Sequence, residues 1–79
     1  MAIHLNLYGT AACHLCETAS ALLRDIKPRM ALSWTEIDIA EDSELLSRYG
    51  IKIPVLYRED NAAELCWPFS TADILTFIR

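Results

Sequence analysis

Apolar residues alternate with other residues over residues 3–8 and then recur at helical spacing over residues 14–27. Alternation at every second position predicts a β-strand with its aliphatic residues on one face. In the second segment the apolar positions recur every three to four residues, which predicts an amphipathic helix. Pro28 disfavours helical geometry at Lys27, so the helix should end there.

The rest of the chain predicts three further strands and two short helices. The predicted strands span residues 32–39, 53–58 and 63–67, and the first short helix spans residues 44–49. Ser70 and Asp73 form a capping-box pattern, which predicts that a last helix begins there. Gly50 stands where many helices end in a left-handed conformation, with Ile51 as the apolar residue that usually follows.

The order of these segments, β-α-β-α-β-β-α, defines an α/β fold. Its first β-α-β unit should form a parallel strand pair with a right-handed crossover, and the last two strands should form an antiparallel hairpin. We therefore predict a four-stranded mixed sheet with helices on both faces. A chain of 79 residues without linkers or repeats makes one domain, residues 1–79.

Composition and charge exclude several classes of protein. Hydrophobic residues make up 53% of the chain, which excludes a disordered chain. The formal net charge is −4, so the chain lacks the basic surface typical of proteins that bind nucleic acid. No apolar run approaches the ~20 residues that span a membrane, and residues 1–6 do not resemble a signal peptide. We expect a cytoplasmic protein.

Cys13 and Cys16 form a CxxC motif where the first predicted strand meets the first predicted helix. Unpaired backbone N–H groups at a helix start stabilise a thiolate, which is the reactive form of cysteine. Cys16 lies one turn further along the same helix face, near enough to form a disulfide with Cys13. His14 adds a cation or a proton donor beside the pair. The motif favours redox chemistry, in which Cys13 attacks a disulfide and Cys16 resolves the mixed disulfide.

Other interpretations of the two cysteines stay open. They could be structural thiols, although a bridge across so short a loop stabilises a fold little. A closed zinc site needs four ligands, and one CxxC motif supplies two of them, so we predict no metal site within one chain. A Cys–His hydrolase would need a histidine that orients the thiol, and the chain offers only His4 and His14.

The dipeptide Ile53-Pro54 would lie beside the CxxC motif in this fold. Trans bonds predominate before proline in general. A cis bond here would turn the backbone of Ile53 outward, where it could pair with an extended thiol peptide.

Residues 66–70 connect the last predicted strand to the last predicted helix. Ser70 and the free N–H groups of the helix start could hold a carboxylate. Alternatively, Ser70 is an ordinary helix cap with Trp67 and Phe69 packed beside it. Cys66 is expected to be a buried core thiol, because free cysteine is often buried.

Three segments resemble a known family: the CxxC motif, the strand at residues 34–39, and the run Arg-Tyr-Gly-Ile-Lys-Ile-Pro-Val-Leu at residues 48–56. They are similar to the glutaredoxin-like proteins of bacteria, a branch of the thioredoxin superfamily, and the resemblance covers nearly the whole chain. It implies a minimal thioredoxin fold, with Cys13 as the attacking thiol, Cys16 as the resolving thiol and Pro54 as a cis-proline. It also implies thiol–disulfide exchange with a protein disulfide or with glutathione disulfide.

Several positions depart from the usual glutaredoxin pattern. His14-Leu15 replaces the usual Pro-Tyr between the cysteines, and no lysine shortly precedes the first of them. Lys52 replaces a threonine, and residues 67–69 replace a double glycine. The redox pair is therefore kept, whereas much of the surface that contacts glutathione is altered.

We therefore predict a small monomeric thiol–disulfide oxidoreductase without a bound organic cofactor, with glutathione as a candidate electron donor. Its predicted catalytic residues are Cys13 and Cys16, and its predicted substrate-binding residues are His14, Ile53, Pro54 and Ser70. One alternative is a thioredoxin-fold module that binds protein partners with little redox turnover, for which exposed Trp67 or Phe69 would provide a surface. Another is a metal carrier that shares the two thiolates across a dimer.

Overall fold

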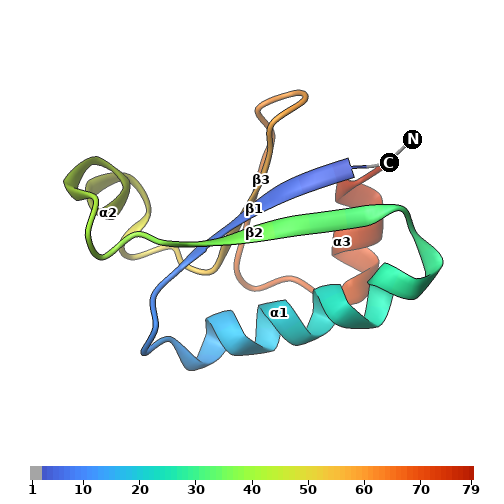
Figure 1. Ribbon diagram of the computed structural model, residues 1–79, viewed down its shortest axis with the longest axis horizontal. Coiled ribbons are helices and arrows are strands. Elements are labelled where there is room, and N and C mark those ends of the chain that lie inside the picture. The colour runs from blue at the N-terminus through green and yellow to red at the C-terminus, as the bar shows by residue number, and fades with distance from the viewer. Residues whose placement is uncertain (1–2) are drawn as a thin grey trace.

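The computed structural model describes residues 3–79 as an α/β fold built on one four-stranded sheet (Figure 1). Its elements are β1 (Ile3–Gly9), α1 (His14–Ile26), β2 (Leu32–Asp38), α2 (Ser43–Tyr49), β3 (Val55–Arg58), β4 (Glu64–Cys66) and α3 (Thr71–Phe77). The predicted order of strands and helices is confirmed. The predicted domain also includes residues 1 and 2, which lie outside the described residues.

The sheet has the strand order β2-β1-β3-β4. β1 runs parallel to β2, with Tyr8 opposite Ile37, and antiparallel to β3, with Tyr8 opposite Val55. β4 adds a second antiparallel pair beside β3. The end of β1, the end of β2 and the start of β3 therefore meet at one end of the sheet, where the chain also enters α1.

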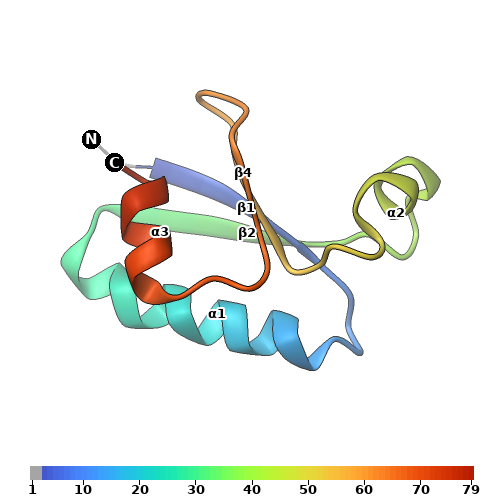
Figure 2. The ribbon, with the colours of Figure 1, turned by 180° about the vertical axis from the view of Figure 1, so that it is seen from behind.

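α1 and α3 cover the same face of the sheet, as the two opposite views show (Figure 1 and Figure 2). Successive side chains of a strand point to opposite faces, so Leu5 and Leu7 of β1 both point toward these helices. The main core consists of Leu5, Leu7, Ala19, Leu23, Ile26, Leu32, Leu56, Phe69, Ile74 and Ile78. The alternation in the first strand and the helical spacing in α1 thus mark the two surfaces that pack together.

α2 packs at one end of the opposite face. Its last residue, Tyr49, stacks on Tyr8 of β1 with 4.7 Å between the ring centroids, and a second, smaller core forms around this pair. Toward the other end the same face carries exposed His4, whose ring nitrogens are hydrogen bonded to Ser33 and Thr35. Helices on both faces were predicted and are found, but α2 lies beside the end of the sheet where the CxxC motif lies (Figure 1).

α1 is the longest helix, with 13 residues. It ends at Ile26, and the chain continues as a 3₁₀ turn, Lys27–Arg29. Pro28 fits the first turn of such a helix because its missing N–H would have no partner there. Among the helices of residues 3–79, none combines the length and apolarity needed to cross a membrane.

The end of α2 differs from the prediction at Gly50. The backbone there is right-handed, with φ −53° and ψ −32°, so the predicted left-handed stop was wrong. The chain makes one further turn, in which the N–H groups of Lys52 and Ile53 both donate to the carbonyl of Tyr49. Ile51 is 99% exposed and makes no capping contact. Glycine is still required, because a Cβ atom on Gly50 would lie 2.5 Å from a carbonyl oxygen of the preceding helical turn.

Candidate redox site

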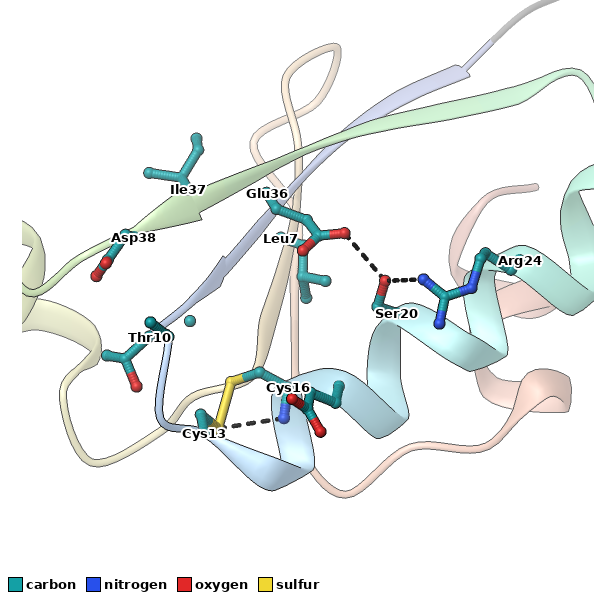
Figure 3. Close-up of a pocket in the computed structure, with 12 residues that line it drawn as sticks. Leu7, Thr10, Cys13, Cys16, Ser20, Arg24, Glu36, Ile37 and Asp38 are labelled. Atoms are coloured by element: carbon teal, nitrogen blue, oxygen red, sulfur yellow. Dashed lines mark hydrogen bonds between the residues drawn. A yellow bond between two sulfur atoms is a disulfide. The ribbon is translucent and has the colours of Figure 1, made fainter.

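Cys13 is the N-cap residue of α1, and its sulfur is joined to that of Cys16 in a disulfide (Figure 3). The Cα atoms of the two residues are 5.2 Å apart, within the usual range for a disulfide. The backbone N–H of Cys16 donates to the sulfur of Cys13 at 3.1 Å. The predicted position of Cys13 at the helix start is confirmed, and the helix supplies a hydrogen-bond donor to its sulfur.

Gly9, the last residue of β1, lies against the disulfide. A Cβ atom on Gly9 would be 2.7 Å from the sulfur of Cys16, so a side chain there would displace that sulfur. The backbone of Gly9 is fixed in the sheet, and its carbonyl accepts the N–H of Ile39 at 2.9 Å. In the sequence Gly9 signals only the end of a strand. Its contact with Cys16 depends on how α1 packs under β1, which local sequence does not reveal.

Ile53 and Pro54 lie on the β3 side of the disulfide. β3 begins at the next residue, Val55, which pairs with Tyr8 of β1. Pro54 therefore lies beside Gly9, the residue that follows Tyr8. The Ile53–Pro54 peptide bond is cis. The N–H of Ile53 donates to the carbonyl of Tyr49 at 3.2 Å. No hydrogen bond within residues 3–79 reaches the carbonyl oxygen of Ile53. That oxygen is therefore the polar backbone group of Ile53 that is free to accept a further hydrogen bond.

His14 projects from the first turn of α1, and its side chain is 89% exposed. Its Nδ1 lies 3.8 Å from a carboxylate oxygen of Glu17. In the described part of the chain the ring forms no hydrogen bond with either sulfur, so its predicted substrate-binding role depends on what approaches it from solvent. Over residues 3–79, no three His, Cys, Asp or Glu side chains are grouped so that they could hold a metal ion.

Ser70 caps α3. Its hydroxyl accepts the N–H of Asp73 at 3.2 Å, and its own N–H donates to the Asp73 carboxylate at 2.8 Å, so the predicted capping box is confirmed. The Asp73 carboxylate occupies the position that an external carboxylate would take. Binding of a substrate carboxylate at Ser70 stays a prediction, and such a ligand would have to displace Asp73.

Cys66 is exposed, so the prediction that it is a buried core thiol was wrong. It is the last residue of β4, which forms an edge of the sheet and is only three residues long. The side chain points to the same face as its partner Val55 in β3, away from the face that α1 and α3 cover. Burial of a thiol at an edge requires a covering element, and the sequence does not show whether one is present.

The two aromatic residues after β4 are packed against each other. Phe69 is buried in the main core, and Trp67 meets it edge-on with 5.0 Å between the ring centroids. Phe69 is therefore not available as the exposed aromatic surface that was considered for a partner-binding module.

A groove of about 550 Å³ lies on the β2 side of the disulfide, between α1 and β2 (Figure 3). It is lined by Cys13, Cys16, Glu17, Ser20 and Arg24 from α1, by Glu36, Ile37 and Asp38 from β2, and by Leu7, Gly9, Thr10 and Ala11 from β1 and the turn that follows it. The hydroxyl of Ser20, 5% exposed, donates to the Glu36 carboxylate at 3.0 Å. It also accepts a hydrogen bond from the Arg24 guanidinium at 3.0 Å. These three side chains form a polar row in the groove wall.

This groove was not predicted from the sequence. Its helical half was visible in principle, since Glu17, Ser20 and Arg24 follow Cys13 at spacings of three or four and so share a helix face. The other half depends on the position of Glu36 beside that face, which follows from the packing of β2 and not from local pattern.

The chain matches a family model described as Glutaredoxin-like domain (DUF836) over residues 4–79. A structural genomics target protein from X. campestris, determined by X-ray methods, is 32% identical with a TM-score of 0.80, over 94% of this chain and 93% of that chain. A protein from Nitrosomonas europaea, determined by solution NMR, is 28% identical with a TM-score of 0.84, over 98% and 92% of the two chains. A malarial protein that is 13% identical has a TM-score of 0.72, over 99% and 94%, and shares the fold.

Proposed function

Because this chain belongs to the family of glutaredoxin-like domains and has a minimal thioredoxin-like fold, we propose that it is a thiol–disulfide oxidoreductase acting through Cys13 and Cys16. One observation carries the proposal. The two cysteines are within disulfide distance at the start of α1, where the N–H of Cys16 donates to the sulfur of Cys13. A reduced Cys13 thiolate in this position would keep that hydrogen bond, and hydrogen bonds to an ionised group are stronger than neutral ones.

In the proposed reaction the Cys13 thiolate attacks one sulfur of a substrate disulfide, and the other sulfur leaves as a thiolate. The product is a mixed disulfide between Cys13 and the substrate. The Cys16 thiolate then attacks the sulfur of Cys13, forms the internal disulfide and releases the reduced substrate. Two electrons pass from the protein to the substrate, so no bound organic cofactor is required.

The proposed substrates are protein disulfides or glutathione disulfide, and the proposed electron donor is glutathione or a protein reductase. The free carbonyl of Ile53 supports the pairing of a bound peptide beside Pro54. We propose that the protein acts as a monomer in a reducing compartment such as the cytoplasm. Disulfides in such compartments are usually transient and catalytic, which fits the proposed exchange at Cys13 and Cys16.

The test is a titration against glutathione redox buffers, with acid trapping and intact-mass readout. We expect a reversible internal disulfide with a defined midpoint in the wild type. The Cys13→Ser variant should lose exchange, and Cys16→Ser should accumulate the mixed disulfide on Cys13. Full exchange activity in Cys13→Ser would rule out this mechanism.

A second candidate is a module that binds a protein partner with little redox turnover. It is supported by two exposed apolar side chains: Leu15, between the cysteines, is 44% exposed, and Ile51, two residues before Ile53, is 99% exposed. Leu15→Ser and Ile51→Ser would then abolish partner capture in crosslinked pull-downs without changing the redox midpoint. Fast exchange with no captured partner would favour the enzyme.

A further inference from the structure

The groove beside the disulfide is long, acidic near the sulfurs and open to an extended ligand. From it we infer that the protein selects substrates in which a basic, extended polypeptide segment flanks the reacting disulfide. The inference rests on the proposed function and names its substrate class. It places recognition on the β2 side of the disulfide, whereas Ile53 and Pro54 lie on the β3 side.

The length of the groove suits an extended chain. Cys16 and Arg24 both line it, and they are eight residues apart on α1. At 1.5 Å per residue this separation is about 12 Å, the reach of about four residues of extended polypeptide. β2, which forms the other wall, is an edge strand, and an edge strand can pair with an extended segment through its free backbone groups.

The charge of the groove favours a cation near the disulfide. Three carboxylates line it, from Glu17, Glu36 and Asp38, against the single guanidinium of Arg24. Arg24 lies at the end away from Cys13 and is hydrogen bonded to Ser20 (Figure 3). Within residues 3–79, no lysine or arginine forms a salt bridge with any of the three carboxylates. Charges of one sign that line a cleft raise the local concentration of oppositely charged ligands.

Glutathione disulfide fits this groove poorly. Each glutathione unit has a net negative charge at neutral pH, which the carboxylates of the groove would repel. The N–H and hydroxyl of Ser70, predicted to hold a substrate carboxylate, are taken by Asp73. A polypeptide with lysine or arginine beside its disulfide satisfies both the length and the charge of the groove.

The test uses two synthetic peptides of equal length, each closed by an internal disulfide and flanked by either lysines or glutamates. The reduced protein transfers two electrons and two protons to the peptide, which leaves as a dithiol while the Cys13–Cys16 disulfide forms. Rates are followed by acid quenching and intact mass. The ratio of the two rates on the same protein at the same pH cancels any effect of a variant on the reactivity of Cys13.

We expect the lysine peptide to react at least about fivefold faster than the glutamate peptide at low ionic strength. The ratio should fall toward one at about 0.5 M salt, because salt screens exposed charges. Glu36→Gln combined with Asp38→Asn should lower the ratio severalfold. Arg24→Gln should raise it, because the change removes the one cation of the groove.

The matched control is Glu44→Gln combined with Glu59→Gln, which makes the same change in net charge at two exposed residues outside the groove. It should leave the ratio unchanged. Exchange at equal rates for both peptides, or a ratio that the groove and control variants change alike, would overturn the inference and leave the proposed function standing. Exchange with neither peptide would overturn both.

Discussion

The sulfur of Cys16 fits against the end of β1 because Gly9 has no side chain. The N–H of Ile39 donates to the carbonyl of Gly9, so the strand backbone here is fixed and cannot easily shift away from the Cys16 sulfur. The position of the Cys16 sulfur is thus set jointly by the helix that carries it and by the strand beside it.

Gly9→Ala should therefore impair the second step of exchange more than the first. The added methyl group pushes the sulfur of Cys16 away from its place beside Cys13, and the mixed disulfide should live at least about tenfold longer, since a small misplacement of reacting atoms has large effects on rate. Acid-quenched mass spectrometry of single turnovers measures this lifetime. Gly50→Ala is the control, because its Cβ also meets a crowded site, but at a helix backbone and not at a sulfur. An unchanged lifetime in Gly9→Ala would contradict the assignment.

Two side-chain anchors hold the helices around this site. The hydroxyl of Tyr49, at the end of α2, donates to the carboxylate of Glu64 in β4, and the Arg48 guanidinium lies over the Tyr49 ring. Arg58, at the end of β3 and only 7% exposed, donates to Asp60 and to the carbonyls of Phe77 and Arg79. α2 and α3 are thus each tied to the β3–β4 hairpin.

The first anchor predicts a loss of stability in alkaline solution. Burial, together with the hydrogen bond to Glu64, raises the pKa of Tyr49 from 10.0 to about 12. Because the folded state holds this proton more tightly, the stabilisation is complete below pH 10 and is lost as the pH rises toward 12. The loss corresponds to roughly 3 kcal/mol. Urea unfolding of wild type and Tyr49→Phe, compared between pH 9 and pH 12, should show a difference that shrinks over this range. Tyr57→Phe serves as the control.

The second anchor predicts a large effect at Arg58. Arg58→Met keeps most of the buried stem but leaves two backbone carbonyls without their donor, and we expect a loss of at least about 2 kcal/mol in the free energy of unfolding. Arg29→Met, at an exposed position, should change it by less than about 0.5 kcal/mol. Equal effects of Arg58→Met and Arg29→Met in urea unfolding would contradict this role of Arg58.

The ion pair also holds the pKa of Asp60 below its usual value, chiefly through the hydrogen bonds from Arg58. The contribution of this ion pair to stability should fade as the pH falls through that lowered pKa.

The order of the elements was predictable because each has a clear local pattern. Alternation marks β1, helical spacing marks α1, and the Ser70–Asp73 pair marks the start of α3. The end of α2 was not predictable from Gly50. Both a left-handed stop and a close approach of backbone require glycine, and the choice between them depends on where the following residues lead the chain.

Across the molecule as a whole, the sequence identified the cysteine pair that forms the disulfide but not the surroundings of that pair. Cys13 and Cys16 are three positions apart in the chain, so their contact follows from one helical turn. The groove is lined by residues from β1, α1 and β2, and the Cys16 sulfur of α1 packs against Gly9 of β1. Contacts of this kind arise from packing between elements that are distant in sequence, and no local spacing encodes them.

The exposure of Cys66 has a practical consequence for handling the protein. In the oxidised protein it is the one free thiol of the described chain, and it lies on the sheet edge opposite to β2. Two chains stored in air should therefore become linked covalently through Cys66 while the Cys13–Cys16 bridge stays intact. A non-reducing gel should show a band of twice the monomer mass that is absent from Cys66→Ser. Persistence of that band in Cys66→Ser would instead assign the linkage to the CxxC pair.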